Sequence, residues 1–538
     1  MVSLALILFV AISCESQHPS KEIPSTLSQP PVLDNWSSDL GVNLENSGSI
    51  FEYVVRLAQN RVIGSSGDDS FKLPDVLERL NYDQYRAIRF KSEMALWKGE
   101  SPFEVQLFHP GFVHKRPVRV NLVSENKIQH VPFDQNFFTY DPPAIPLLSG
   151  SYPNLDYAGF RVHYPINDLS VQDEVIVFLG ASYFRVLGRG HVYGLSSRGL
   201  AIDTGLNRAE EFPHFTDFWL VKPEAGSSEM TFYAVLDSPS VTGAYRFVLK
   251  PGARTVLDVD ARVFARKNVD KIGFAPMSSM FLYGQNRRPW FDDFRPQVHD
   301  SDGLLIHTAG NDWIWRPLRN GPGVNVTSFS GPLPKGFGLL QRQRMFDSYL
   351  DVEARYHQRP SEWIIPRKGD WGTGHIELLE YSTVSEFNDN IAAYWVPDEP
   401  FRAGESRQYS YSIRMFDDRV PEQDVARVKN MRIGWDTLPG SPESPSKSQR
   451  RFVIDFSDDD STFEKSTASV QGIIEVSTGH VSDLVVHPLS DVHGWRASFR
   501  FVPANNQQAE ITLYLVSDQR RRLTETWNYT WDPSQVHE

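Results

Sequence analysis

The sequence of 538 residues is too long for one ordinary hydrophobic core, so it predicts two domains or one very large sandwich with an added module. Aromatic residues make up 12% and charged residues 22% of the chain, which is typical of a folded protein and excludes a disordered one. The 54 basic and 67 acidic residues give a net charge of -13, which argues against nucleic acid or anionic lipid as a partner and is compatible with a neutral polysaccharide.

The chain begins with a short apolar run, residues 4–13, that ends at its single cysteine, Cys14. The run is too short to span a bilayer as a helix and fits the hydrophobic region of a secretory signal. Two interpretations stay open: Ala-Ile-Ser-Cys is similar to a bacterial lipobox, in which Cys14 carries a lipid anchor, or a plain signal peptide is cut nearby and Cys14 is removed. Both interpretations export the protein. Residues 1–47 are expected to form this leader and a poorly ordered segment rich in Ser, Pro, Asn and Gln.

Two short helices are expected before the strands begin, over residues 51–60 and 82–88, with Asp83 capping the start of the second. After them come short runs of alternating apolar and polar residues, such as residues 118–123, separated by Gly, Pro and Asp turns. This alternation is typical of strands with one face towards water. Such runs continue to about residue 415 with hardly an amphipathic helix among them. The sequence therefore predicts a large antiparallel sandwich and not a βαβ fold.

The predicted strands fall into two groups. The large sandwich is expected over residues 48–418, a short charged linker over residues 419–430, and a second group of strands over residues 431–538. About a hundred residues of short strands suit an immunoglobulin-like sandwich. The predicted fold class is all-β, with a large antiparallel sandwich followed by a smaller immunoglobulin-like one.

The segment from residue 299 to residue 395 is unusually dense in carboxylates, tryptophans and arginines. It contains HDSDGL at 299–304, NDWIWRP at 311–317, RY at 355–356, RPSEW at 359–363, GDWG at 369–372 and NDNIAAYW at 388–395. Such a composition suits a sugar-cleaving site, because aromatic faces stack on pyranose rings, planar charged groups bind hydroxyls and two carboxyl groups move protons. The alternative is a β-rich core in which Trp packs and Asp caps turns.

Aromatic and guanidinium side chains are the candidate sugar-binding groups. In this segment they are Trp313, Trp315, Trp363 and Trp371 as stacking platforms, with Arg316 and Arg359 as partners of hydroxyl or carboxylate groups. Strand alternation places Trp313 and Trp315 on one face, so both bind or both belong to the core. Tyr193 with Arg198 forms a weaker second group. The scattered histidines form no metal-spaced set, so no metal or other cofactor is expected.

Several longer motifs occur in order over residues 50–418, and one more lies near the C-terminus. They are LGASYF at 179–184, VYGLSSRGLAIDT at 192–204, EEFP at 210–213, LDSP at 236–239, TGAY at 242–245, APMSSMF at 275–281, GFGLLQ at 336–341, NDN at 388–390 and TETWNY at 524–529. On these motifs the chain resembles the periplasmic glucan biosynthesis proteins G and D of Gram-negative bacteria, which take part in making osmoregulated periplasmic glucans.

The resemblance implies a periplasmic location and a large sandwich similar to galactose mutarotase. It also implies similarity to inverting glycoside hydrolases that cut β-1,2-glucan internally. In the family pattern Asp389 of the NDN motif is the general acid, Asp300 of the HDS motif is its partner on the base side, and Tyr356 belongs to the proton relay and substrate contacts. The residues alone allow other roles: Asp389 closes a turn, Asp300 or Asp302 caps the turn at Gly303, and Tyr356 packs in the core.

Two functional classes follow from the resemblance. One is an endo-β-1,2-glucanase that processes periplasmic glucan, and the other is a non-catalytic glucan-binding protein that guides branching or export through the same groove. In both classes the expected partner is a β-glucan, and other glucan biosynthesis proteins are further expected partners. A mutarotase-like epimerase is suggested by the fold alone and is the weakest of the three. The motifs leave both the G and the D type open.

Overall fold

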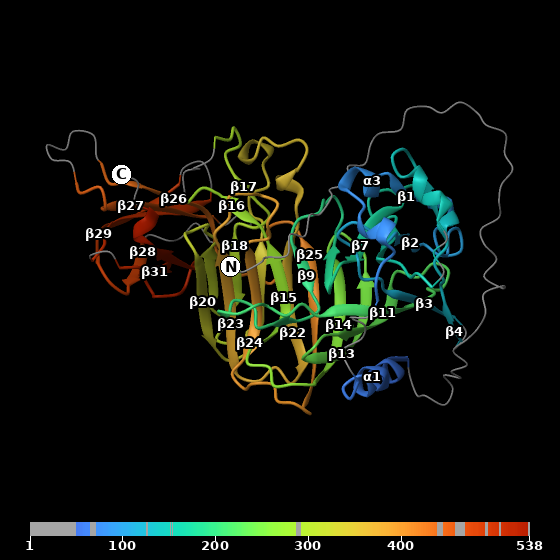
Figure 1. Ribbon diagram of the computed structural model, residues 1–538. Coiled ribbons are helices and arrows are strands. Elements are labelled where there is room, and N and C mark those ends of the chain that lie inside the picture. The colour runs from blue at the N-terminus through green and yellow to red at the C-terminus, as the bar shows by residue number, and fades with distance from the viewer. Residues whose placement is uncertain are drawn as a thin grey trace. The chain divides into compact units, whose positions relative to one another are not determined.

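The computed structural model describes residues 50–535 except 65–70, 125–126, 151, 153, 287–291, 438–444, 458–468, 490–492 and 505–506. Most of its elements are strands, and nearly all strand pairs are antiparallel, so the predicted all-β fold is confirmed (Figure 1). The leader over residues 1–47, with Cys14, lies outside the described residues. Within the described ranges, no helix has the length and apolar character needed to cross a membrane.

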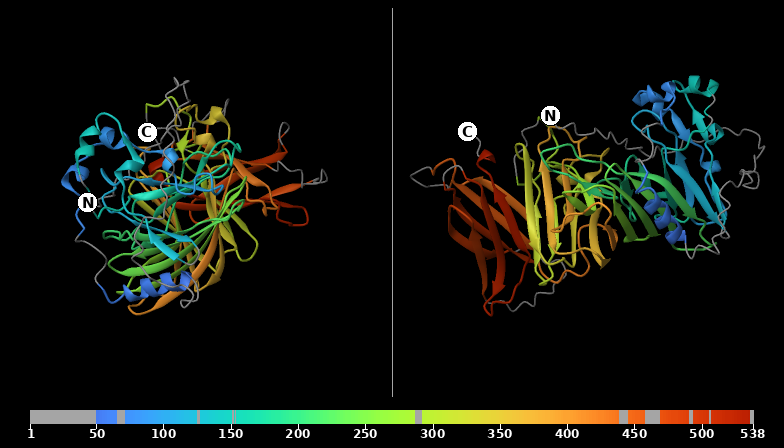
Figure 2. Two further views of the ribbon diagram at one scale, coloured as in Figure 1. Left: turned by 90° about the vertical axis from the view of Figure 1, so that its right-hand side faces the viewer. Right: turned by 60° about the horizontal axis from the view of Figure 1, so that its bottom comes forward.

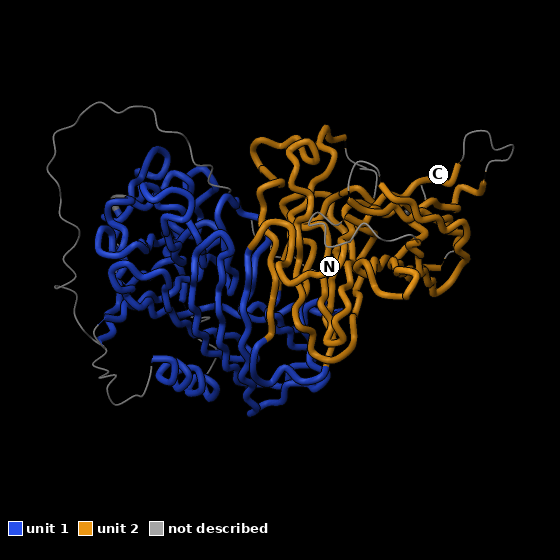
Figure 3. Tube along the Cα trace, turned by 180° about the vertical axis from the view of Figure 1, so that it is seen from behind, with its two compact units in different colours: residues 1–276, 367–373, 394–415 blue, residues 277–366, 374–393, 416–538 orange. Residues whose placement is uncertain are grey.

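The chain divides into two compact units that alternate along the sequence (Figure 3). Unit 1 comprises residues 1–276, 367–373 and 394–415, and unit 2 comprises residues 277–366, 374–393 and 416–538. These units follow packing and not chain order. The predicted domain bounds and the linker over residues 419–430 stay a prediction.

Three short α-helices open unit 1. They are α1 (Ile50–Asn60), α2 (Asp75–Glu78) and α3 (Tyr82–Arg86). Helix α1 is amphipathic and buries Val54, Val55 and Ala58 against a small apolar cluster of unit 1. The predicted cap of α3 is wrong. Asn81 is the N-cap, because its side chain accepts the N–H of Gln84 while the Gln84 side chain accepts the N–H of Asn81, which satisfies two exposed helix donors at once.

The strands of unit 1 are short and closely spaced. They are β1 (Ile88–Phe90), β2 (Glu104–Phe108), β3 (Arg119–Ser124), β4 (Lys127–His130), β5 (Phe138–Tyr140), β6 (Gly159–Tyr164), β7 (Asp173–Leu179), β8 (Tyr183–Val186), β9 (Ser196–Arg198), β10 (Ala201–Ile202), β11 (His214–Val221), β12 (Met230–Asp237), β13 (Val241–Lys250) and β14 (Thr255–Ala265). Four further strands contain residues of both units. They are β15 (Ile272–Ser279), β22 (Ser361–Gly369), β24 (Ile391–Pro397) and β25 (Ser406–Phe416).

Two layers of strands form the sandwich of unit 1. One layer has the order β25-β14-β13-β12-β11-β3-β4, and the other has the order β2-β6-β7-β8-β9. Phenylalanines from the two layers meet between them: the ring of Phe178 on β7 lies 5.2 Å from that of Phe218 on β11 and 5.4 Å from that of Phe247 on β13. Along β14 buried and partly exposed residues alternate, as the sequence pattern predicted for a strand with one face in a core.

The strands of unit 2 come from its three chain segments. They are β16 (Phe281–Tyr283), β17 (Val298–His299), β18 (Gly303–His307), β19 (Trp313–Pro317), β20 (Val324–Gly331), β21 (Gly336–Leu340), β23 (Gly374–Tyr381), β26 (Arg427–Trp435), β27 (Arg450–Ser457), β28 (Val470–Val476), β29 (His480–Pro488), β30 (Gly494–Val502), β31 (Ala509–Ser517) and β32 (Thr526–Trp531). Short 3-10 helices occur in both units: η3 (Ser92–Met94), η4 (Gln135–Phe137), η5 (Ile145–Ser149), η6 (Phe346–Ser348), η7 (Tyr356–Gln358) and η8 (Pro533–Gln535).

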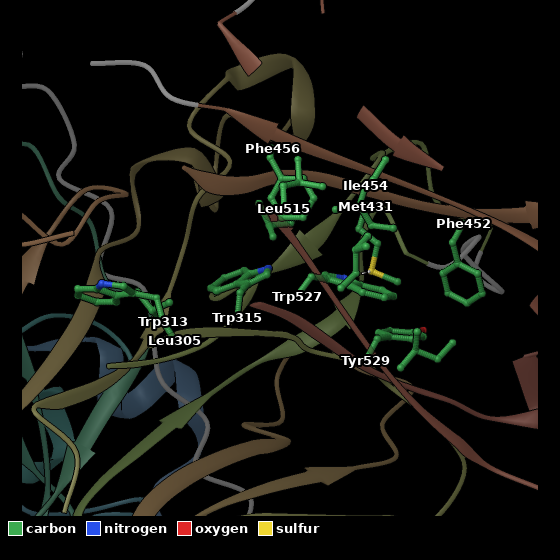
Figure 4. Packing of buried hydrophobic residues seen from close by; sticks show 14 of the residues in the cluster. Leu305, Trp313, Trp315, Met431, Phe452, Ile454, Phe456, Leu515, Trp527 and Tyr529 are labelled. Atoms are coloured by element: carbon green, nitrogen blue, oxygen red, sulfur yellow. Dashed lines mark hydrogen bonds between the residues drawn. The ribbon is translucent and has the colours of Figure 1, made fainter. Parts of the chain in front are cut away.

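The C-terminal strands of unit 2, coloured orange to red in Figure 2, form two facing sheets. One sheet has the order β26-β27-β30-β29, and the other runs β28-β31-β32 and continues through β19 into β18, β21 and β22. The link is a parallel pairing in which Trp315 lies opposite Trp527. Between the sheets, the ring of Phe452 lies 5.9 Å from that of Trp527. The C-terminal strands therefore share one core with β18, β19 and β22. Figure 4 shows Leu305, Trp313 and Trp315 in this core.

We expect Phe178→Ala to lower the free energy of unfolding by about 3–5 kcal/mol, because the Phe178 ring is buried and touches rings of both layers, so its removal leaves a cavity between them. Urea denaturation measures the change. The control is Leu169→Ala, since Leu169 is fully in solvent and should lose less than about 0.5 kcal/mol. Equal effects of the two substitutions would contradict the sandwich core.

Candidate functional site

The motif Asn388-Asp389-Asn390 lies between β23 and β24 and is held by its two amides. The Asn390 side chain is buried, accepts the N–H of Phe281 at 2.8 Å and donates to the carbonyl oxygens of Phe281 and Tyr381. Asn388 donates to Thr383 Oγ1 at 3.3 Å. These bonds fix the backbone on both sides of Asp389, whose side chain is partly exposed. The predicted general acid thus stands on a segment anchored to β16 and β23.

The other two predicted catalytic residues, Asp300 and Tyr356, contact the same arginine, Arg359. Asp300 directly follows β17 and is almost fully buried, and the guanidinium of Arg359 donates to its Oδ1. The same guanidinium covers the ring of Tyr356, with its central carbon 4.1 Å from the ring centroid. The predicted sugar ligand Arg359 therefore serves as the cation for Asp300 and packs on Tyr356.

The Tyr356 hydroxyl extends this chain of contacts to Glu386. It donates to Glu386 Oε2 at 2.7 Å, three residues before Asp389. Burial, together with the carboxylates of Asp300 and Glu386 and against the effect of Arg359, raises the pKa of Tyr356 above its ordinary value. The phenol is therefore neutral at pH 7 and acts as a hydrogen-bond donor.

Arg295 joins three loops around this group. Its Nη1 donates to Asp351 Oδ2 at 2.9 Å and to Glu386 Oε2 at 2.8 Å, and its Nη2 donates to Asp293 Oδ2 at 2.7 Å. Asp293 lies before β17, Asp351 lies between η6 and η7, and Glu386 lies in the β23–β24 loop. One guanidinium thus fixes the loop that carries Asp389 against the loops that precede Asp300 and Tyr356.

A small apolar cluster packs against these loops. It consists of Met280, Leu282, Tyr283, Val298, Tyr349 and Tyr356. The η6–η7 loop above it holds two non-glycine residues in the left-handed region, Leu350 at φ 56° and Arg355 at φ 46°. Side chains with a Cβ rarely adopt this backbone without compensating contacts, and such strain concentrates at functional loops.

The buried His299 and the partly exposed Asp302 form a second polar group close in sequence to Asp300. The Gln341 amide nitrogen donates to the backbone oxygen of His299, so the Gln341 oxygen, 2.8 Å from His299 Nδ1, is an acceptor. Burial lowers the pKa of His299 below its ordinary value despite the nearby Asp302 carboxylate. Asp302 accepts the backbone N–H groups of Arg342 and Gln343. These contacts give Asp302 a structural role in joining β18 to the segment after β21.

A small open pocket lies next to Asp302. Its walls come from the end of β16, from β19 and from the start of β26, and include Trp315, Arg342, Lys429 and Asn430. The Arg342 guanidinium lies 3.6 Å above the Trp315 ring and pairs with Glu525 at its other side. The indole is therefore covered by an arginine and not open to a sugar face.

The prediction that four tryptophans are stacking platforms is wrong for this fold. Trp313, Trp315 and Trp363 belong to the core that β18, β19 and β22 share with the C-terminal strands, and each is 3% exposed (Figure 4). Trp371 is buried in unit 1 against Phe274 and Tyr409. An indole with both faces packed in a core cannot stack on a pyranose ring. The expectation that Trp313 and Trp315 share one face is confirmed, with the core as the outcome.

Two predicted arginine contacts are also structural. Arg316 is fully buried, pairs with Glu510 at 2.9 Å and donates to Asn528 at 2.6 Å, which ties β19 to β31 and β32. In unit 1, Arg198 is buried and pairs with Glu210 at 2.6 Å. Both guanidinium groups are buried and paired with protein carboxylates, so neither is open to a sugar ligand in this fold. Tyr193 is partly exposed, and its role as a sugar contact stays a prediction.

Two charged residues at the centre of the site were missed from the sequence. Glu386 accepts from Tyr356 and Arg295. Arg295 lies between the motifs that drew attention, and Glu386 is one of many acidic residues in the loops. The only local signal was the position of Glu386 three residues before Asp389 in the NDN motif.

Comparison with known proteins identifies the family. The model of the periplasmic glucan biosynthesis protein MdoG matches residues 50–531. Glucans biosynthesis protein G of Ralstonia nicotianae is 43% identical over 466 residues, 86% of this chain and 92% of the relative. The protein G of Bradyrhizobium diazoefficiens is 40% identical over 484 residues, 89% of this chain and 93% of the relative. A probable glucans biosynthesis protein D of Shewanella oneidensis is 40% identical over 492 residues, 90% of this chain and 88% of the relative.

The chain belongs to the periplasmic glucan biosynthesis protein family, as its motifs predicted. The cluster of Asp300, Tyr356, Arg359 and Glu386, with Asp389 on the adjoining segment, is the candidate functional site of a periplasmic glucan biosynthesis protein. Relatives of both types match at similar identity, so the G and D types remain open.

We expect Arg295→Gln to lower the free energy of unfolding by about 2–4 kcal/mol, because it leaves three partly buried carboxylates without their shared cation. Urea denaturation measures this loss. Hydrogen exchange should also become faster in residues 345–358 and 383–390.

Arg208→Gln is the matched control. Arg208 pairs with two carboxylates, those of Asp203 and Asp270, but its side chain is 47% exposed, so its replacement should cost clearly less stability than that of Arg295. If both variants lose the same stability and the loops exchange as before, Arg295 does not hold them.

The pH dependence of stability should report the Asp293–Arg295 contact. Hydrogen bonds from Arg295 hold the pKa of Asp293 at about 2, below the ordinary 3.8. A depressed pKa stabilises the fold above the unfolded value, and this contribution is lost as the pH falls from 3.8 towards 2. The difference in unfolding free energy between the wild type and Asp293→Asn should therefore shrink between about pH 5 and about pH 2.5. In the Arg295→Gln background this pH dependence should become weaker but not vanish, because the backbone N–H of residue 295 and the Tyr283 side chain still lower the pKa of Asp293. An unchanged dependence would show that the Arg295 side chain is not its main cause.

Proposed function

We propose that the protein is an inverting endo-β-1,2-glucanase that acts on the backbone of periplasmic glucan. The observation that carries the proposal is the contact chain Asp300–Arg359–Tyr356–Glu386, which ends on the segment of Asp389. Two carboxyl groups of different environment are what an inverting hydrolase requires.

The proposed reaction assigns opposite proton tasks to the two aspartates. Asp389, partly exposed, donates a proton to the leaving glycosidic oxygen as its bond to the anomeric carbon breaks. A water molecule attacks that carbon from the opposite face and gives its proton to the base side, where Asp300 lies. The products are two shorter glucans, and the new reducing end has the inverted anomeric configuration.

The base side needs a route for the proton, because Asp300 is almost fully buried. The Tyr356 hydroxyl donates to Glu386, and the Tyr356 ring packs against the same Arg359 guanidinium that donates to Asp300, so we assign the relay to Tyr356 and Glu386. General acid and base groups of this kind contribute about 10²–10⁴-fold each to a rate.

A non-catalytic glucan-binding protein is the second candidate. The observation in its favour is the ion pair between Asp300 and Arg359, because this pair already occupies the buried carboxylate that the hydrolase would need as its base. In this case the same loops would bind glucan without cutting it.

The decisive experiment incubates the purified protein with linear β-1,2-glucan and follows chain length by chromatography. We expect the wild type to shorten the polymer and Asp389→Asn to lower the rate by at least about 10²-fold, since the amide cannot donate the required proton. Asp270→Asn is the control, because its carboxyl group is 65% exposed and lies in unit 1. NMR of the first products reports the anomer.

An intact polymer with the wild type, accompanied by a rise in melting temperature on adding glucan, would favour the binding protein. If the Asp389→Asn variant retains the full activity of the wild type, another residue is the general acid.

A further inference from the structure

Four large apolar side chains stand in solvent around the Arg295 cluster. Phe294 is 76% exposed, Val352 74%, Val384 83% and Phe387 68%. Folded proteins expose single apolar side chains commonly, but a group of them in one place marks a binding surface.

The salt bridges of Arg295 bring them together. Phe294 is the neighbour of Arg295 itself, Val352 follows Asp351, and Phe387 follows Glu386. Asp351 and Glu386 both accept from Arg295 Nη1, at 2.9 Å and 2.8 Å. The chain segments that carry the three exposed side chains therefore converge on one nitrogen atom. We name Phe294, Val352, Val384 and Phe387 the apolar rim.

The charge under the rim restricts its occupant. Asp293, Asp351 and Glu386 share the cation of Arg295, so this group of four side chains carries a net negative charge. Such a group repels nucleic acid and anionic lipid headgroups. A neutral chain with apolar faces is compatible with both the charge and the exposed phenyl rings.

Glucose rings present such faces. The C–H groups of a pyranose ring make a flat apolar face that packs on a phenyl ring, while its hydroxyls accept and donate hydrogen bonds at the edge. At the rim, the two exposed phenylalanines directly follow Asp293 and Glu386 in the sequence, and carboxylates can accept from hydroxyls. The rim also adjoins Tyr356 through Glu386.

We propose that Phe294 and Phe387 bind glucosyl units of a β-glucan beside the contact chain, with Val352 and Val384 widening the surface. This inference rests on the proposed function for the identity of the polymer, but it assigns the binding to side chains outside the proton-transfer residues. It replaces the four buried tryptophans as the aromatic contribution to glucan recognition.

The test measures binding apart from cleavage. The dissociation constant of linear β-1,2-glucan is determined by titration calorimetry with Asp389→Asn protein, which does not consume the ligand. We expect Phe294→Ala and Phe387→Ala each to weaken binding roughly tenfold, and the double variant more than either. Phe294→Trp with Phe387→Trp should keep the affinity. Leu169→Ala with Val171→Ala, exposed apolar residues of unit 1, should leave it unchanged.

Undiminished affinity of the double alanine variant overturns the proposal. So does a loss of affinity that comes with a lower melting temperature, since exposed rings should not stabilise the fold. The proposal is also overturned if the variants change only self-association, measured by sedimentation, or only binding to phosphatidylglycerol vesicles. If the wild type fails to cut glucan but the alanine variants still bind it less tightly, the hydrolase proposal fails and the rim stands.

Discussion

The candidate site depends on the ion pairs that the Arg295 guanidinium makes with three carboxylates. Loops of antiparallel sandwiches are joined to their own strands only at their ends, so loops far apart in sequence need a side chain to hold them in a common position. Arg295 supplies it by donating to Asp293, Asp351 and Glu386. A planar, permanently charged group suits this task, because it can donate to several carboxylates at fixed angles without losing its charge.

From Arg295 one chain of hydrogen bonds and ring contacts leads inward. Glu386 accepts from Tyr356, the Tyr356 ring packs on Arg359, and Arg359 donates to Asp300. The almost fully buried Asp300 therefore has a cation as its partner. The same path ends on the segment of Asp389, which the buried Asn390 anchors to β16. Polar contacts therefore help to set the positions of the two proposed proton-transfer residues, in addition to the small apolar cluster against which these loops pack.

The tryptophans have the opposite role. Density of indoles beside carboxylates suggested a sugar site, yet Trp313, Trp315 and Trp363 fill the core between β19, β22 and the C-terminal strands. The sequence pattern was read correctly as strands with a shared face, but a sugar platform and a core residue have the same local pattern. What separates them is the strand that packs above. For Trp315 that neighbourhood includes Trp527 of β32, whose segment is far away in the chain.

Sequence alone determined the all-β class, the helices α1 and α3 but not α2, the family and the presence of the Asn388–Asn390 motif, because periodicity and motifs are properties of neighbouring residues. It could not distinguish Arg359, which pairs with Asp300, from Arg316, which ties β19 to a strand 212 residues later. It also passed over Glu386 and Arg295, since neither belongs to a motif. Tertiary structure decided burial, ion pairing and the exposure of Phe294 and Phe387. Those properties depend on which distant segments meet, and that is fixed only when the sheets have paired and packed.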